Sequence, residues 1–190
     1  MRLFFAIPLP NQIKQILQNK CLLMKNKFPP GVWVQANNYH ITLSFLGDTE
    51  TQMLPQLTDL ANLIGSSFTQ GSLELTDMNA FPSRRNVRTL FCSISNEGWL
   101  EDLGLELRRN LFALGFKIDT PFHPHITLAR FRDPVKQHFS FPWNQFIVNE
   151  KMNFTCFELL DSHLKPTGPL YTTVATFNVS KEDKTDGRKG

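Results

Sequence analysis

The tetrapeptide His-Ile-Thr-Leu occurs twice in this chain, beginning at His40 and at His125, so the two copies lie 85 residues apart. Such a repeat indicates an internal duplication. In a β-strand, side chains alternate between the two faces, so each copy presents its His and Thr on one face and its Ile and Leu on the other. If a pseudo-twofold axis relates the copies, two imidazoles and two hydroxyls converge on one cleft.

These four polar side chains suit one kind of chemistry. Imidazoles with reference pKa values near 6.5 can divide two proton transfers at neutral pH, one ring acting as general base and the other as general acid. The hydroxyls of Thr42 and Thr127 can donate hydrogen bonds to anionic oxygens. Such a set favours attack of an oxygen nucleophile on a phosphodiester, without a metal. The repeat therefore predicts a phosphodiester substrate.

Other basic residues allow different interpretations. His123 and His125 have the spacing of two imidazoles that bind a metal from one strand. We do not favour a metallohydrolase, because no carboxylate adjoins either copy and the chain is short for a barrel of about 250 residues. We interpret His123 as a strand-entry residue, and His138 and His163 as surface histidines. A turn carries three further basic residues that are either a solvated loop or a contact with the RNA backbone: Arg84, Arg85 and Arg88.

Hydrophobic periodicity supplies the elements that must position these residues. Strands and single helices alternate, which indicates an α+β domain with mostly antiparallel pairing. Leucines at helical spacing from Leu100 to Leu111 predict core packing. We expect helices at 11–27, 51–64 and 99–114, the second ending at Gly65. We expect strands at 2–9, 32–34, 39–46, 73–78, 87–94, 125–131, 152–160 and 171–179.

Composition limits the class of protein. The 190 residues and 17 phenylalanines predict one globular domain with an aromatic-rich interior, over 1–180, followed by a polar disordered tail at 181–190. A net charge of +3 is too small to indicate nucleic-acid binding by overall charge, so any polyanion site must be a local patch. Three cysteines without a CxxC pair favour a reducing compartment, the cytoplasm. No apolar run reaches the length of about 20 residues of a membrane span.

The sequence resembles the 2H phosphoesterases and, among them, the RNA 2′,3′-cyclic phosphodiesterases, also called 2′-5′ RNA ligases. Its most specific feature is the doubled HxTx motif with Arg130 closing the second copy. One departure is Phe91, where related proteins commonly have Trp; we interpret it as a core aromatic. The resemblance is carried by the segments RLFFAIPLP, HITLSFLG, HPHITLAR and SHLKPTGPLY, a Phe81-Pro82 turn with Arg85, and a leucine-spaced helix ending in Gly115.

This resemblance implies a bilobal, pseudo-twofold α+β fold with two antiparallel sheets lining a central groove and helices outside. It implies hydrolysis of RNA 2′,3′-cyclic phosphate ends to 2′-phosphates, weak reverse ligation, an RNA substrate, and no metal or nucleotide cofactor. His40 and His125 would be the acid and base, Thr42 and Thr127 the phosphate donors, and Arg130 a phosphate or base contact. We favour His125 as the group that activates water and His40 as the group that protonates the departing 3′ oxygen.

One further prediction comes from the repeat itself. Phe45 and Arg130 each lie five residues after the motif histidine, so they occupy equivalent positions. Strict alternation would point both away from the cleft. We predict that a bulge or strand end turns both back, so that an aromatic face and a guanidinium can hold a base. The alternative function is a monomeric RNA-end binding module that uses the same groove without turnover.

Overall fold

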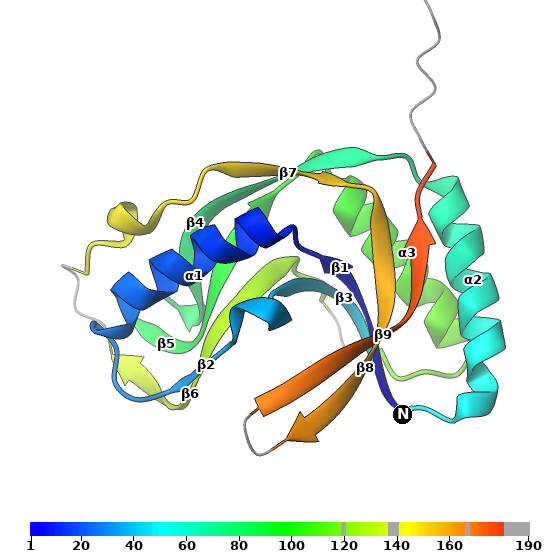
Figure 1. The fold of residues 1–190 in the computed structure, drawn as a ribbon, viewed down its shortest axis with the longest axis horizontal. Helices are drawn as coiled ribbons and strands as arrows, with labels where there is room; N and C mark the ends of the chain where they lie inside the picture. Colours follow the sequence, from blue (N-terminus) through cyan, green and yellow to red (C-terminus); the bar gives the residue numbers. More distant parts are fainter. Residues whose placement is uncertain (119–120, 137–140, 166–167, 181–190) are drawn as a thin grey trace, which may run out of the picture.

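The computed structural model describes residues 1–118, 121–136, 141–165 and 168–180 (Figure 1). The expected tail at 181–190 and His138 lie outside these residues. The strands are β1 (Arg2–Pro8), β2 (Val32–Trp33), β3 (His40–Asp48), β4 (Gly71–Ser83), β5 (Asn86–Ser95), β6 (His125–Lys136), β7 (Glu150–Phe154), β8 (Cys156–Lys165) and β9 (Gly168–Asn178). The α-helices are α1 (Asn11–Lys25), α2 (Leu54–Ser67) and α3 (Trp99–Ala113), and short 3₁₀ helices span Ala36–Asn38, Thr51–Met53 and Trp143–Phe146.

Within the described ranges the strands form one curled sheet, in which every named strand pair is antiparallel. The order is β7-β4-β5-β6-β3-β1-β8-β9, with β2 added on β6. The first four strands form one lobe and the last four form the other. This arrangement confirms the expected bilobal α+β fold with antiparallel pairing. The two sheets expected from the resemblance are joined into one, because β3 pairs with β6.

The helices cover the outside of the curled sheet (Figure 1). α1 lies at the end of the molecule formed by β4, β5 and β6, whereas α2 and α3 pack together at the other end, where α3 contacts β3 and α2 contacts β9. The predicted leucine stripe of α3 is fully buried, from Leu100 to Leu111. None of the described helices has both the length and the apolar character that crossing a membrane requires.

The two HxTx strands lie side by side at the junction of the lobes. In the part of the chain that the structure describes, β3 and β6 share one registered pair, Ile41 with Ile126, and both side chains are completely buried. These isoleucines are equivalent residues of the two copies, so the local twofold axis passes between them. Because facing residues of neighbouring strands point the same way, the register sets His40 opposite Thr127 and Thr42 opposite His125 on the other face of the sheet.

Each HxTx strand carries a bulge at the leucine of its motif. Leu43 is the extra residue where β3 pairs with β1, and Leu128 is the extra residue where β6 pairs with β5. An inserted residue shifts the alternation of faces by one position. Phe45 and Arg130 are consequently exposed and line the same cavity. The bulge predicted from the repeat is thus confirmed in both copies.

The expected single strand at 152–160 is wrong. β7 ends at Phe154 and β8 begins at Cys156, and the two strands pair with different neighbours, β4 in one lobe and β1 in the other. The chain therefore crosses between the lobes at Thr155. An unbroken pattern of β-forming residues does not show this crossing, because each half of the segment satisfies the pattern equally well.

The predicted end of the second helix at Gly65 is also wrong. α2 continues to Ser67, and Gly65 is a buried residue within it. A Cβ atom at this position would lie 2.8 Å from the carbonyl oxygen of Asn178. Glycine is needed here because the helix approaches the backbone of β9 closely, so the residue marks a packing contact and not a helix stop.

The interior is rich in phenylalanine, as the composition predicts. Phe5, Phe157 and Phe177 are fully buried, with ring centroids 5.2 to 6.1 Å apart. They belong to a hydrophobic cluster that also includes Ile41 and Ile126 and reaches through both lobes. Aromatic rings bury large areas, so this cluster fixes the strands that carry the motifs.

We expect the isoleucine pair at the lobe junction to contribute strongly to stability. Ile41→Ala or Ile126→Ala should lower the free energy of unfolding by about 2–5 kcal/mol, because each change removes buried methyl groups and leaves a cavity, whereas Ile126→Val should cost about 0.5–1.5 kcal/mol. Urea denaturation measures both values. Leu22→Ala on the exposed side of α1 is the control and should change stability by less than about 0.5 kcal/mol. Equal losses in the control and the junction variants would contradict the role of the pair.

Candidate active site

Each motif histidine is oriented by a backbone carbonyl two residues before it. Nδ1 of His40 lies 2.7 Å from the carbonyl oxygen of Asn38, and Nδ1 of His125 lies 2.7 Å from that of His123. A carbonyl oxygen only accepts hydrogen bonds, so Nδ1 is the donor in both rings and Nε2 carries the lone pair of the neutral imidazole. The two rings therefore present the same nitrogen for proton transfer.

The hydroxyl of Thr42 completes the orientation of the first ring. Its Oγ1 lies 3.0 Å from Nε2 of His40 and donates to that nitrogen when the ring is neutral. Both residues start β3 and lie two positions apart, on one face of the strand. A substrate oxygen that approaches Nε2 thus meets a hydroxyl at the same place.

Aromatic rings enclose the imidazole of His40. The ring of Phe4 on β1 lies 5.1 Å away, centroid to centroid, and that of Tyr171 on β9 lies 5.3 Å away in an edge-to-face arrangement. Phe4 and Tyr171 also contact each other, at 5.0 Å. Tyr171 therefore packs on His40 and does not fill the hydrophobic core.

His125 has an equivalent aromatic enclosure in the other lobe. The rings of Phe81 and Phe91 lie 5.3 Å from it, both edge to face, and they stack on each other at 4.3 Å. Phe91 is buried, as expected for a core aromatic, but it also forms a wall of the site. Each motif histidine therefore packs against a pair of aromatic rings that also contact each other.

This enclosure changes the proton affinity of both rings. The pKa of His40 is lowered from 6.5 to about 4, and burial is the main cause. The hydrogen bond to the Asn38 carbonyl opposes this shift, whereas the positive charges of His125, Lys14 and Arg130 contribute to it. Burial also lowers the pKa of His125. Both rings are neutral at pH 7 in the free protein. The registered pair of Ile41 with Ile126 sets both imidazoles on the same face of two adjacent strands.

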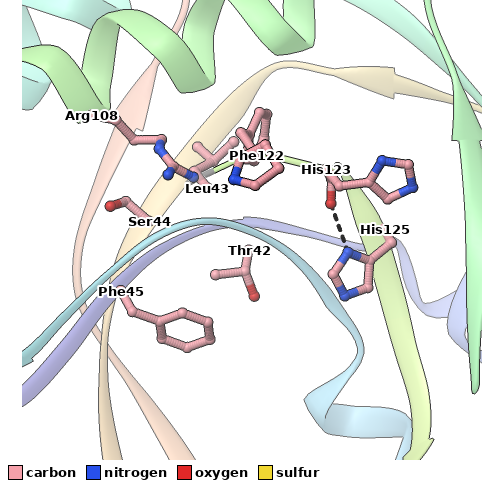
Figure 2. Close-up of a pocket in the computed structure, with 9 residues that line it drawn as sticks. Thr42, Leu43, Ser44, Phe45, Arg108, Phe122, His123 and His125 are labelled. Atoms are coloured by element: carbon pink, nitrogen blue, oxygen red, sulfur yellow. Dashed lines mark hydrogen bonds between the residues drawn. The ribbon is translucent and has the colours of Figure 1, made fainter. Parts of the chain in front are cut away.

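His40 lines a cavity of about 320 Å³ together with Lys14, Glu158 and Tyr171. Two further cavities adjoin the motif strands. The first has a volume of about 200 Å³, and Figure 2 shows the Thr42 hydroxyl and the His125 ring directed into the space between Phe45 and His123. The second has a volume of about 430 Å³. Phe45, 58% exposed, lines both. Other residues around the larger cavity are Arg2, Phe4, Arg130, Ser162 and Tyr171.

A model of one protein family covers most of the chain. Residues 11–156 match the 2′-5′ RNA ligase superfamily. The chain belongs to this superfamily. The match contains the first HxTx strand, the helix α3 and the second HxTx strand, so it includes every motif residue that sequence reasoning selected.

Similar proteins extend the match. An RNA 2′,3′-cyclic phosphodiesterase from Geobacillus stearothermophilus is 31% identical over 67% of this chain and 41% of its own length, so this chain spans less than half of that relative. A Thermotoga maritima protein of the same name is 28% identical over 90% of this chain and 91% of its own. The crystal structure of Escherichia coli LigT complexed with 3′-AMP has a TM-score of 0.77 and 30% identity, covering 94% of this chain and 98% of that chain.

The six predicted site residues of this 2′-5′ RNA ligase superfamily member come from two adjacent strands. β3 carries His40, Thr42 and Phe45, and β6 carries the residues His125, Thr127 and Arg130. The enclosing rings of Phe4 and Phe81 were not selected, because an alternating apolar strand gives no sign of a catalytic neighbour. Lys14 on α1 was not selected either, and its positive charge contributes to the lowered pKa of His40.

The remaining histidines and arginines have other partners. The side chain of His163 is 53% exposed and lies 3.1 Å from Asp161, which agrees with a surface histidine. His123 is exposed and precedes β6, as expected, and its carbonyl orients His125. Arg84 forms an ion pair with Asp77. Among the described residues, no three side chains of the metal-ligating types His, Cys, Asp and Glu cluster together.

Removal of an aromatic wall should raise the pKa of the enclosed imidazole. Tyr171→Ala lets water reach His40, so its pKa should rise from about 4 toward 6.5, because desolvation is the main cause of its depression. A titration of the histidine ring protons by NMR measures the change. Leu164→Ala on the same hairpin, at an exposed position, is the matched control and should leave the pKa unchanged. A His40 pKa that stays near 4 in Tyr171→Ala would show that the enclosure is not the cause.

Proposed function

We propose that this protein hydrolyses RNA 2′,3′-cyclic phosphate ends to 2′-phosphate ends, with His40 and His125 as acid and base. The observation that carries the proposal is the pair of equally oriented imidazoles, each with Nδ1 bonded to a backbone carbonyl, on two strands that meet at one registered pair. The names of the Geobacillus and Thermotoga relatives support this activity. Each imidazole can take up or release a proton at Nε2, which in His40 also accepts the hydrogen bond of Thr42 Oγ1.

The proposed reaction needs one proton transfer at each end of the phosphorus centre. Nε2 of His125 accepts a proton from water, whose oxygen attacks phosphorus. The bond from phosphorus to O3′ breaks, and His40 donates a proton to O3′, leaving a 2′-phosphate. Hydroxyls of Thr42 and Thr127 donate to the phosphoryl oxygens and stabilise the developing charge. Because His40 is neutral in the free protein, the negative charge of the bound phosphate must raise its pKa before it can act as the acid.

The larger cavity is the proposed site of the terminal nucleoside. Phe45 presents its ring to this cavity and Arg130 lines it as well, so a base can stack on the ring while the guanidinium contacts the base or the phosphate. Phe4 and Tyr171, which enclose His40, line the same space. This places the ribose of the cyclic phosphate on the His40 side of the phosphorus.

Further parts of the proposal concern the working form of the protein. We propose that residues 1–180 act as one bilobal catalytic domain and that the protein is a monomer in the cytoplasm, where its three free cysteines stay reduced. It acts without a metal or nucleotide cofactor, because the imidazoles and hydroxyls supply proton transfer and phosphate binding themselves. In the reverse direction, a 5′-hydroxyl in place of water gives weak 2′-5′ ligation.

Alanine substitution of either motif histidine should abolish most of the turnover. In assays with 2′,3′-cyclic AMP, His40→Ala and His125→Ala should lower kcat by about 10²–10⁴-fold, because each removes one proton transfer. His163→Ala, at an exposed histidine outside both cavities, is the matched control and should retain wild-type activity. Excess EDTA should not reduce the activity of the wild-type protein.

The same experiment separates the proposal from an RNA-end binding module. Binding of the cyclic nucleotide by a protein that never turns it over would establish the module instead. Undiminished turnover in either histidine variant would refute the assignment of that residue, and loss of activity in EDTA would point to a metal-dependent reaction.

The pH dependence should also follow from the lowered pKa values. The reactive form of the free protein carries one proton on the pair of imidazoles. This singly protonated form is most populated at pH values between the two pKa values of the pair. Since the pKa of His40 is about 4 and that of His125 is below 6.5, the bell-shaped profile of kcat/KM should have its maximum between these values. Above them it should fall about tenfold per pH unit. A maximum above pH 7 would contradict this prediction.

A further inference from the structure

We propose that Asn38 is a positioning residue of the active site, because its side chain ties the strand that carries Tyr171 to the segment that orients His40. This inference rests on the proposed function, in which His40 is the acid. The backbone carbonyl of Asn38 accepts the hydrogen bond of His40 Nδ1 at 2.7 Å. The side chain of Asn38 adds a second contact, to a residue 131 positions further along the chain.

The second contact is a hydrogen bond to β9. The side-chain amide nitrogen Nδ2 of Asn38 donates to the carbonyl oxygen of Pro169 at 2.7 Å, in a partly buried position. A carbonyl oxygen only accepts hydrogen bonds, so this contact depends on the N–H groups of the amide. One residue therefore reaches the imidazole with its main chain and β9 with its side chain.

The start of β9 needs such a contact because this strand lies at the edge of the sheet. Among the strands of the described ranges, β9 pairs with β8 alone, and Pro169 is its second residue. The outer side of an edge strand has no neighbouring strand to hold it. The hydrogen bond from Asn38 holds the start of β9 to the 3₁₀ helix Ala36–Asn38, which lies just before the first motif strand.

The strand held in this way carries one wall of the His40 enclosure. Tyr171 follows Pro169 by two residues, so both side chains lie on one face of β9, and both line the 430 Å³ cavity. The Tyr171 ring lies 5.3 Å from that of His40 and 5.0 Å from that of Phe4. A displacement of β9 at Pro169 moves the Tyr171 ring and admits water to the imidazole. Asn38 thus acts on His40 through Tyr171.

The second motif copy uses the equivalent residue in a similar way. His123, two residues before His125, orients the motif ring through its carbonyl. The side chain of His123 contacts the enclosure of that ring, at 5.4 Å from Phe81 and 6.0 Å from Phe91. In both copies one residue combines a main-chain contact to the motif histidine with a side-chain contact to the element that encloses it. This correspondence favours positioning over an incidental hydrogen bond.

The charged and titratable groups that face His40 all stay in place when Asn38 is substituted. They are Lys14 on α1, Glu158 on β8, Tyr171 on β9, and His125 and Arg130 on β6. The Asn38 side chain itself carries no charge. A changed His40 pKa in an Asn38 variant therefore reports altered access of water to the ring, and not a lost or added charge.

The experiment measures the pKa of His40 by NMR titration of the histidine ring protons in the free protein. The proteins are the wild type, Asn38→Ala, Tyr171→Ala and the double variant. Asn37→Ala is the matched control, because this neighbouring residue is exposed and accepts the hydrogen bond of Lys14 through its backbone carbonyl, which the substitution keeps. Turnover of 2′,3′-cyclic AMP is measured on the same proteins, and thermal unfolding confirms that each is folded.

We expect Asn38→Ala to raise the pKa of His40 from about 4 to about 5, because a displaced Tyr171 ring lets water reach the imidazole. The double variant should have the same His40 pKa as Tyr171→Ala, since two changes that act through one contact do not add. In Asn38→Ala, kcat should fall about tenfold and KM should stay within about threefold of wild type, because the proton donor is misplaced while the substrate contacts remain. Asn37→Ala should change none of these values.

The other outcomes separate this inference from the proposed function. A His40 pKa that stays near 4 in Asn38→Ala would overturn the positioning role, and so would a further rise when Asn38→Ala is added to Tyr171→Ala. Either result, with a wild-type protein that hydrolyses the cyclic nucleotide, leaves the proposed function intact. Failure of the wild-type protein to hydrolyse the cyclic nucleotide would overturn the proposed function and, with it, any role of Asn38 in turnover.

Discussion

The pairing of Ile41 with Ile126 is the contact on which the rest of the site depends. Among the described residues it is the one register pair between β3 and β6, and it lies at the centre of the duplication. Because side chains alternate along a strand, burying these two isoleucines on one face forces the neighbouring His and Thr of both motifs onto the opposite face. The hydrophobic free energy of the core thus sets the positions of the polar groups.

Enclosure of the imidazoles has a chemical consequence as well as a structural one. Aromatic rings hold both histidines in place and keep water from them, which disfavours the charged form and lowers both pKa values. The free protein therefore holds two neutral bases. An anionic substrate between them reverses part of this effect, because its charge stabilises an imidazolium. Under the proposed reaction, the substrate helps to create the acid that protonates its own leaving oxygen.

The duplication is symmetric where the phosphate would bind and asymmetric beside it. The histidines, threonines, carbonyl contacts and bulges correspond between the copies, yet the second residue after each bulge is Phe45 in one strand and Arg130 in the other. A phosphodiester has nearly equivalent oxygens about phosphorus but different groups attached to them. Two equivalent imidazoles beside two different side chains, an aromatic ring and a guanidinium, match such a substrate.

Local patterns in the sequence determined the motif strands, the shared face of their His and Thr, and the buried leucines of α3. These features depend on strand and helix periodicity, which residues close in the chain express by themselves. Tertiary structure alone decided the crossing between lobes at Thr155, the close approach of Gly65 to β9, the aromatic walls around each imidazole and the cavities. These depend on contacts between segments distant in sequence, and desolvation, which lowers the histidine pKa values, exists only once those segments have packed.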